Sequence, residues 1–117
     1  MQVRYEPREG HLLVVASGKF DAERCRAAMI EINRQCAERQ LANELVDFRG
    51  VGDVVSIADR YELAKFLADS KPPGRMAIVV SPPQRFTGTF EDTAVNRGAP
   101  VRTTSSEAEA REFLGLG

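Results

Sequence analysis

The sequence has no tryptophan, one histidine and two cysteines, so it offers few of the side chains on which metal sites and nucleophilic catalysis depend. His11 has no second histidine with which to bind zinc, and the Gly-x-Ser-x-Gly motif of serine hydrolases does not occur. Cys25 and Cys36 lie about 16 Å apart along a predicted helix, too far for a disulfide. We therefore expect two buried thiols, no metal, no cofactor and no enzymatic activity.

Long apolar runs and a charge excess are also missing. The longest apolar runs, such as residues 12–16, are too short for a transmembrane helix or the core of a signal peptide. The 16 basic residues nearly balance the 17 acidic ones, which argues against binding to nucleic acid through bulk charge. We expect a cytoplasmic protein without a membrane span.

The length of 117 residues predicts a single domain over residues 1–117. Apolar alternation, helical spacing and turn residues predict its elements. In the second helix, Ile57, Tyr61 and Ala64 are expected on the apolar side. The predicted strands cover residues 2–6, 11–17, 44–48, 75–81 and 100–104, and the predicted helices cover residues 22–40, 57–69 and 86–95 and begin again at 107.

This order predicts an α/β fold with an N-terminal β-hairpin followed by alternating strands and helices. Each later strand is reached through a helix, so the sheet should be mixed and mostly parallel, with helices packed against it. In such sheets, binding sites lie beyond the carboxyl ends of the strands. The segment 49–56, which follows the third strand, is one of these places.

The stretch 47–56, Asp-Phe-Arg-Gly-Val-Gly-Asp-Val-Val-Ser, resembles the signature of STAS domains of the anti-sigma-factor antagonist type. Ser56 falls on the serine that a partner kinase phosphorylates in that family. Residues 76–80, the Phe90-Glu-Asp segment and the Pro-Val-Arg ending resemble the SpoIIAA-like branch, which is related to Sec14-type lipid-binding domains. The sequence departs from the regulatory pattern at Val55, where the family has Asp, and at Ala58, where it has Gly.

The resemblance implies a non-enzymatic signalling module that binds another protein, a kinase or an anti-sigma-like partner, through the N-terminus of the second helix. Ser56 is then either a phosphoacceptor or simply the cap of that helix, which alone would explain a serine there. Five charged residues are candidates for a partner-binding rim, although solvated loop charge would by itself explain four of them and a helix cap would explain the fifth, Asp21. They are Asp21, Arg49, Asp53, Asp59 and Arg60.

A second interpretation is a carrier or sensor of a small apolar molecule, as the Sec14 relationship implies. Tyr61, Phe86 and Phe90 are the candidate lining of its groove, beneath the helix at residues 86–95. Ordinary core packing would also explain these aromatic residues. A homodimer stays open as well, because nothing in the sequence decides the oligomeric state.

Overall fold

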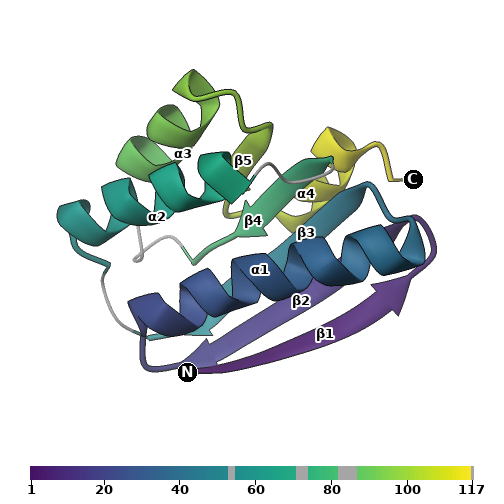
Figure 1. The fold of residues 1–117 in the computed structure, drawn as a ribbon, viewed down its shortest axis with the longest axis horizontal. Coiled ribbons are helices and arrows are strands. Elements are labelled where there is room, and N and C mark those ends of the chain that lie inside the picture. The colour runs from purple at the N-terminus through teal and green to yellow at the C-terminus, as the bar shows by residue number, and fades with distance from the viewer. Residues whose placement is uncertain (53–54, 71–73, 82–86, 117) are drawn as a thin grey trace.

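The computed structural model describes residues 1–52, 55–70, 74–81 and 87–116. Five strands and four helices follow one another in the predicted order (Figure 1). They are β1 (Gln2–Arg8), β2 (His11–Gly18), α1 (Ala22–Arg39), β3 (Asn43–Val51), α2 (Ile57–Ser70), β4 (Arg75–Val79), α3 (Thr87–Asn96), β5 (Val101–Thr104) and α4 (Glu107–Leu114).

The strands form one sheet in the order β1-β2-β3-β4-β5. β1 pairs with β2 in antiparallel fashion, and the other neighbours are parallel, because each of those connections passes through a helix. Helices α1, α2 and α3 cover one face of the sheet and α4 covers the other (Figure 1). The predicted α/β class and the mostly parallel sheet are confirmed.

Each central strand sends alternate side chains to the two faces. On β4, Met76 and Ile78 pack toward α1, α2 and α3, while Ala77 and Val79 pack against Ala110 of α4 and its neighbours. A strand that is buried on both faces needs apolar residues at every position, which is the pattern of residues 76–80. This pattern fits the interior position of β4, between β3 and β5.

Strand β3 runs three residues further than the 44–48 predicted for it. The register between β2 and β3 shifts after Val15, and pairing then resumes between Ser17 and Gly50 and between Gly18 and Val51. Gly50 suits this extension because a Cβ there would lie 3.1 Å from the Ala16 carbonyl oxygen. Gly50 thus permits a close approach between two strands.

The predicted apolar side of α2 is wrong at its first turns. Ile57 is 68% exposed and Tyr61 is 41% exposed, whereas Leu63, Ala64 and Leu67 are buried. The buried stripe is short because α2 packs between α1 and α3 rather than lying flat on the sheet. Two large apolar side chains consequently remain at the surface near Ser56.

Candidate interaction surface at the start of the second helix

Ser56 caps α2 and is exposed to solvent. Its Oγ accepts a hydrogen bond from the Asp59 backbone N–H at 3.1 Å, and its carbonyl oxygen accepts one from the Arg60 N–H at 2.9 Å. The cap satisfies one of the backbone donors that a helix N-terminus leaves without an intrahelical partner. The hydroxyl therefore has a structural role and is accessible to another molecule.

The residue before the cap anchors it in the core. Val55 is 2% exposed, and its carbonyl oxygen accepts a hydrogen bond from Arg60 Nε at 2.9 Å. An aspartate at this position would bring a carboxylate into an apolar environment at high cost. The departure from the STAS pattern at Val55 thus has a physical reason: an apolar anchor, clamped by Arg60, holds Ser56 at the surface.

Asp21 and Asp59 lie at the same end of the molecule as Ser56. Asp21 caps α1 by accepting a hydrogen bond from the Arg24 N–H at 3.1 Å. Burial, together with the nearby carboxylates of Asp21 and Asp59, raises the pKa of the Cys25 thiol to about 12. Since both carboxylates act on one thiol of α1, the N-termini of α1 and α2 are neighbours, each with an acidic residue.

Arg49 makes its contacts on the other side of the sheet. Its Nε and Nη2 donate to the two carboxylate oxygens of Asp47, each at 3.0 Å, and Nη2 lies 3.4 Å from Glu107 Oε1 at the start of α4. Hydrogen bonds from Arg49 lower the pKa of Asp47. The sequence interpretation grouped Arg49 with Ser56, but the structure joins it to Asp47 and Glu107 instead. Asp53 lies outside the described residues.

Next to Ser56, the exposed Ile57 and Tyr61 stand one turn apart on α2 and so share a face. The Tyr61 hydroxyl oxygen lies 3.4 Å from Arg97 Nη2, and Lys65 Nζ lies 5.3 Å from the ring centroid. Aromatic residues and arginine are both enriched in protein interfaces. We refer to Ser56, Ile57 and Tyr61 as the α2 surface.

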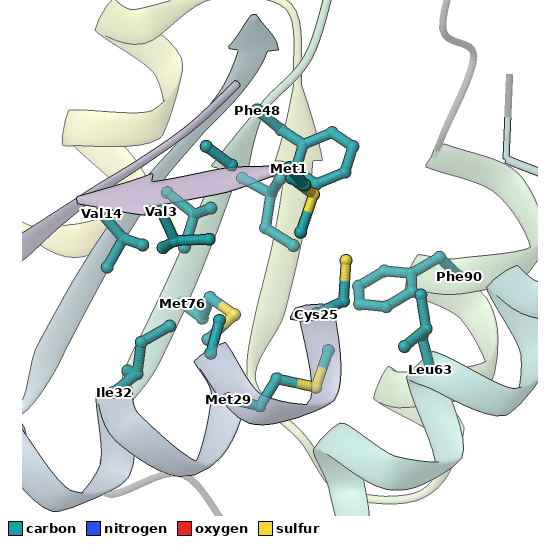
Figure 2. A pocket seen from close by; sticks show the side chains of 14 residues that line it. Met1, Val3, Val14, Cys25, Met29, Ile32, Phe48, Leu63, Met76 and Phe90 are labelled. Atoms are coloured by element: carbon teal, nitrogen blue, oxygen red, sulfur yellow. The ribbon is translucent and has the colours of Figure 1, made fainter. Parts of the chain in front are cut away.

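Tyr61 and Phe90, two of the residues predicted to line an apolar groove, lie in different places. Tyr61 is at the surface, whereas Phe90 is 1% exposed and lines a cavity of about 60 Å³ between the sheet and helices α1, α2 and α3 (Figure 2). The third, Phe86, lies outside the described residues. Every described residue that lines the cavity is apolar, Phe48 and Leu63 among them.

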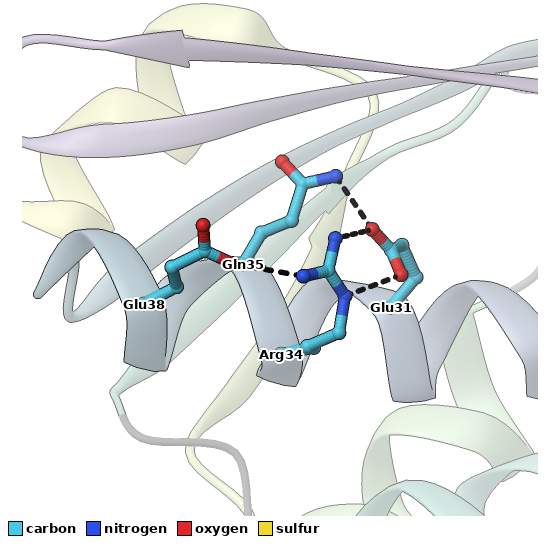
Figure 3. Close-up of polar contacts among 4 residues, drawn as sticks. All are labelled: Glu31, Arg34, Gln35 and Glu38. Carbon is cyan, nitrogen blue, oxygen red and sulfur yellow. Dashed lines mark hydrogen bonds and ion pairs between the residues drawn. The ribbon is translucent and has the colours of Figure 1, made fainter.

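A charged network on the outer side of α1 is satisfied within the helix. Arg34 bonds Glu31 at 2.6 and 2.9 Å and Glu38 at 2.8 Å, while Gln35 donates to Glu31 at 2.8 Å (Figure 3). The hydrogen bond from Arg34 lowers the pKa of Glu31 to about 2. Such pairs, three and four residues apart, support the helix, so these charges are not a candidate binding site.

The sequence reasoning missed Glu44, which is fully buried at 0% exposure on β3. Neither carboxyl oxygen has a hydrogen-bond partner among the described residues, and desolvation raises its pKa to about 8. His11 is also buried, with Nδ1 3.3 Å from the Glu9 carbonyl oxygen. In the described part of the chain, no group of three or more His, Cys, Asp or Glu side chains could hold a metal ion.

Comparisons with known proteins agree on the fold. A crystal structure of an anti-sigma factor antagonist from Mycobacterium paratuberculosis is 17% identical, with a TM-score of 0.63 over 97% of this chain and 93% of that one. The NMR structure of the protein TM1081 is 13% identical, with a TM-score of 0.57 over 100% of this chain and 91% of that one. Neither the protein-family models nor the curated proteins match the chain. The chain thus has the STAS fold that the resemblance implied.

Within residues 1–52, 55–70, 74–81 and 87–116, no helix combines the length and the apolar character that crossing a bilayer needs.

Proposed function

We propose that this protein is a non-enzymatic regulatory module that binds another protein through the α2 surface. The observation that carries the proposal is the exposure of Ile57 beside the capping hydroxyl of Ser56. An isoleucine that is 68% exposed adds nothing to the core, but it becomes favourable once a partner covers it. The likeness of the fold to an anti-sigma factor antagonist supports a protein partner, such as a kinase or an anti-sigma-like protein.

The contact is tested by capturing partners in the native host with the wild-type protein and with Ile57→Glu. Ile30→Glu is the matched control, because Ile30 is 59% exposed on α1, outside the α2 surface. A partner that wild type and Ile30→Glu capture and Ile57→Glu loses supports the proposal. Equal capture by all three proteins, each confirmed as folded by circular dichroism, contradicts it.

Phosphorylation of Ser56 would change this surface strongly. A phosphate adds about −1.5 to −2 charges at the helix N-terminus, next to the acidic residues Asp21 and Asp59. The helix dipole favours that charge, while the two carboxylates oppose it, so the potential seen by a partner shifts. We propose that this change releases or recruits the partner.

Mass spectrometry of protein from the native host tests the modification, and Ser56→Asp tests its effect on binding. A phosphate on Ser56 together with altered capture by Ser56→Asp supports control by phosphorylation. Unmodified Ser56 across growth conditions, with unchanged capture by Ser56→Asp, removes this control. That result leaves the contact through Ile57 to be judged by its own experiment.

The cavity bears on the second candidate function, a carrier of a small apolar molecule. It lies mainly between α1 and the sheet, and Phe90 is the residue of α3 that lines it. Its volume of about 60 Å³ is well below the roughly 150 Å³ that holds benzene, and a lipid chain needs more still. Native mass spectrometry for a co-purified lipid tests this candidate, which would require the helices to move apart.

A further inference from the structure

Four sulfur-bearing side chains line the apolar cavity, and they include all three methionines of the chain. Met1 precedes β1, Met76 lies on β4, and Cys25 and Met29 stand one turn apart on α1. Figure 2 shows their sulfur atoms around the same space. Segments far apart in the sequence therefore bring three thioethers and one thiol to one interior site.

The size and polarity of the cavity restrict what could occupy it. No polar side chain is found among the described residues of its lining, so a water molecule would lack hydrogen-bond partners. An organic molecule as small as benzene needs more than twice its volume of about 60 Å³. A single ion is small enough for this volume and can take sulfur atoms as its ligands.

Sulfur donors select a particular class of metal. Thioether and thiolate ligands are soft and prefer Cu(I) to the harder ions that bind carboxylate and carbonyl oxygens. We propose that the cavity binds one soft monovalent metal ion, Cu(I) or its analogue Ag(I), through the Cys25 thiolate and the thioethers of Met29 and Met76, with Met1 beside them. This site is separate from the α2 surface and does not depend on the proposed function.

The charge balance favours a monovalent ion. When the ion binds, the S–H bond of Cys25 breaks, a sulfur–metal bond forms, the proton passes to solvent and no electron is transferred. One thiolate and one monovalent cation make a neutral unit, which avoids the cost of an isolated charge in an apolar interior. Since the thiol gives up its proton when the ion binds, binding competes with protonation.

Two of the four side chains provide a route to the surface. Met1 and Met29 are partly exposed, whereas Cys25 and Met76 are buried. Methionine side chains are unbranched and flexible, so Met1 and Met29 can swing aside without disturbing the strands. An ion would enter between the side chains of Met1 and Met29 and then meet the deeper sulfur atoms.

Ag(I) is the probe for the test, since it shares the soft character of Cu(I) and resists oxidation. Native mass spectrometry should show one Ag(I) per chain with one proton lost. In protein carrying ¹³C-methyl methionine, the methyl signals of Met29 and Met76 should shift as the ion is added. Competition with a chelator should give an affinity that rises roughly tenfold per pH unit in the range where the thiol is protonated.

Variants show whether Ag(I) binds at this site or at any thiol of the protein. Cys36→Ala is the matched control, because Cys36 is buried on α1 but does not line the cavity. It should bind Ag(I) like wild type, while Cys25→Ala loses binding. Met29→Leu and Met76→Leu nearly conserve side-chain volume but remove a sulfur atom, and each should weaken binding about tenfold or more.

Three results would overturn the proposal. They are methionine methyl signals that do not move with Ag(I), binding that disappears in Cys36→Ala rather than in Cys25→Ala, and methyl signals that respond to xenon or benzene but not to Ag(I). The last result would identify the cavity as a site for apolar molecules. The methyl readout uses the wild-type protein, so the proposal stays testable even if a variant fails to fold.

Discussion

The backbone of Gly74 passes directly against Ala42: a Cβ added to Gly74 would lie 1.3 Å from the Ala42 carbonyl oxygen. Ala42 precedes β3, and Gly74 precedes β4. The two strands begin side by side, with Asn43 paired to Arg75. Glycine at position 74 therefore allows the sheet to start its parallel β3–β4 ladder at this register.

Gly74→Ala should destabilise the protein strongly. The obstacle is backbone rather than the end of a flexible side chain, so the strands must separate, and we expect a loss of about 3 kcal/mol or more in the free energy of unfolding. Gly52→Ala is the control, because a Cβ at Gly52 meets nothing within 4 Å. Urea denaturation of the two variants measures the difference, and similar midpoints would contradict this account of Gly74.

The fold was largely predictable because its main signals are local. Apolar residues at every position of 76–80 predict a strand covered on both faces, and the Cys25, Ile32 and Cys36 spacing predicts the buried stripe of α1. The caps at Asp21 and Ser56 were visible for the same reason, since a helix N-terminus requires a side-chain oxygen within a few residues.

The errors come from contacts between segments far apart in sequence. Gly50 looked like a loop residue, but its partner Ser17 comes from another strand. The Thr104 hydroxyl donates to Glu109 at 2.7 Å and accepts from the Ser106 N–H at 3.1 Å, so the cap that Ser106 and Glu109 form on α4 is closed through a residue of β5. The cavity is lined by residues from β1 to β4 and from α1 to α3, and no local pattern reports how these elements pack.

Because of Glu44, the folded protein should become less stable as the pH rises. The pKa of Glu44 is raised to about 8 in the folded state from an ordinary value of 4.5, because burial disfavours the charged form. The folded protein therefore binds a proton that the unfolded chain has released, and stability falls as the pH rises from about 4.5 through about 8. We expect a loss on the order of 3–5 kcal/mol between pH 5 and pH 9.

Glu44→Leu should remove most of this dependence and be more stable than wild type at pH 9, since it replaces a desolvated carboxylate with an apolar group of similar size. Urea denaturation at several pH values measures the effect. Glu112→Gln, at an exposed position on α4, should keep the wild-type profile. A Glu44→Leu profile parallel to that of wild type would show that Glu44 does not titrate in this range.

The ion pair between Asp47 and Arg49 should stabilise the protein less as the pH falls. Hydrogen bonds from Arg49 lower the pKa of Asp47, so its contribution is present above the ordinary pKa of 3.8 and is lost as the pH falls through the lower folded value. Both side chains are partly exposed, and we expect Arg49→Met to cost only about 0.5–1 kcal/mol at pH 7. The cost should vanish once Asp47 is protonated. A cost that persists unchanged in strong acid, measured by thermal denaturation, would indicate lost packing instead.

Ser56 has a stabilising role that any functional experiment has to separate from binding. Ser56→Ala removes the acceptor for the Asp59 N–H and should cost about 1 kcal/mol, whereas Ser56→Asp keeps a side-chain oxygen at the cap and should stay within about 0.5 kcal/mol of wild type. Ser105→Ala, an exposed serine just outside the cap of α4, should have little effect. Chemical denaturation measures all three, and an unchanged Ser56→Ala would mean that the cap hydrogen bond contributes nothing. Because Ser56→Asp retains the cap, a change in partner capture by that variant reports on charge at the α2 surface rather than on an unfolded helix.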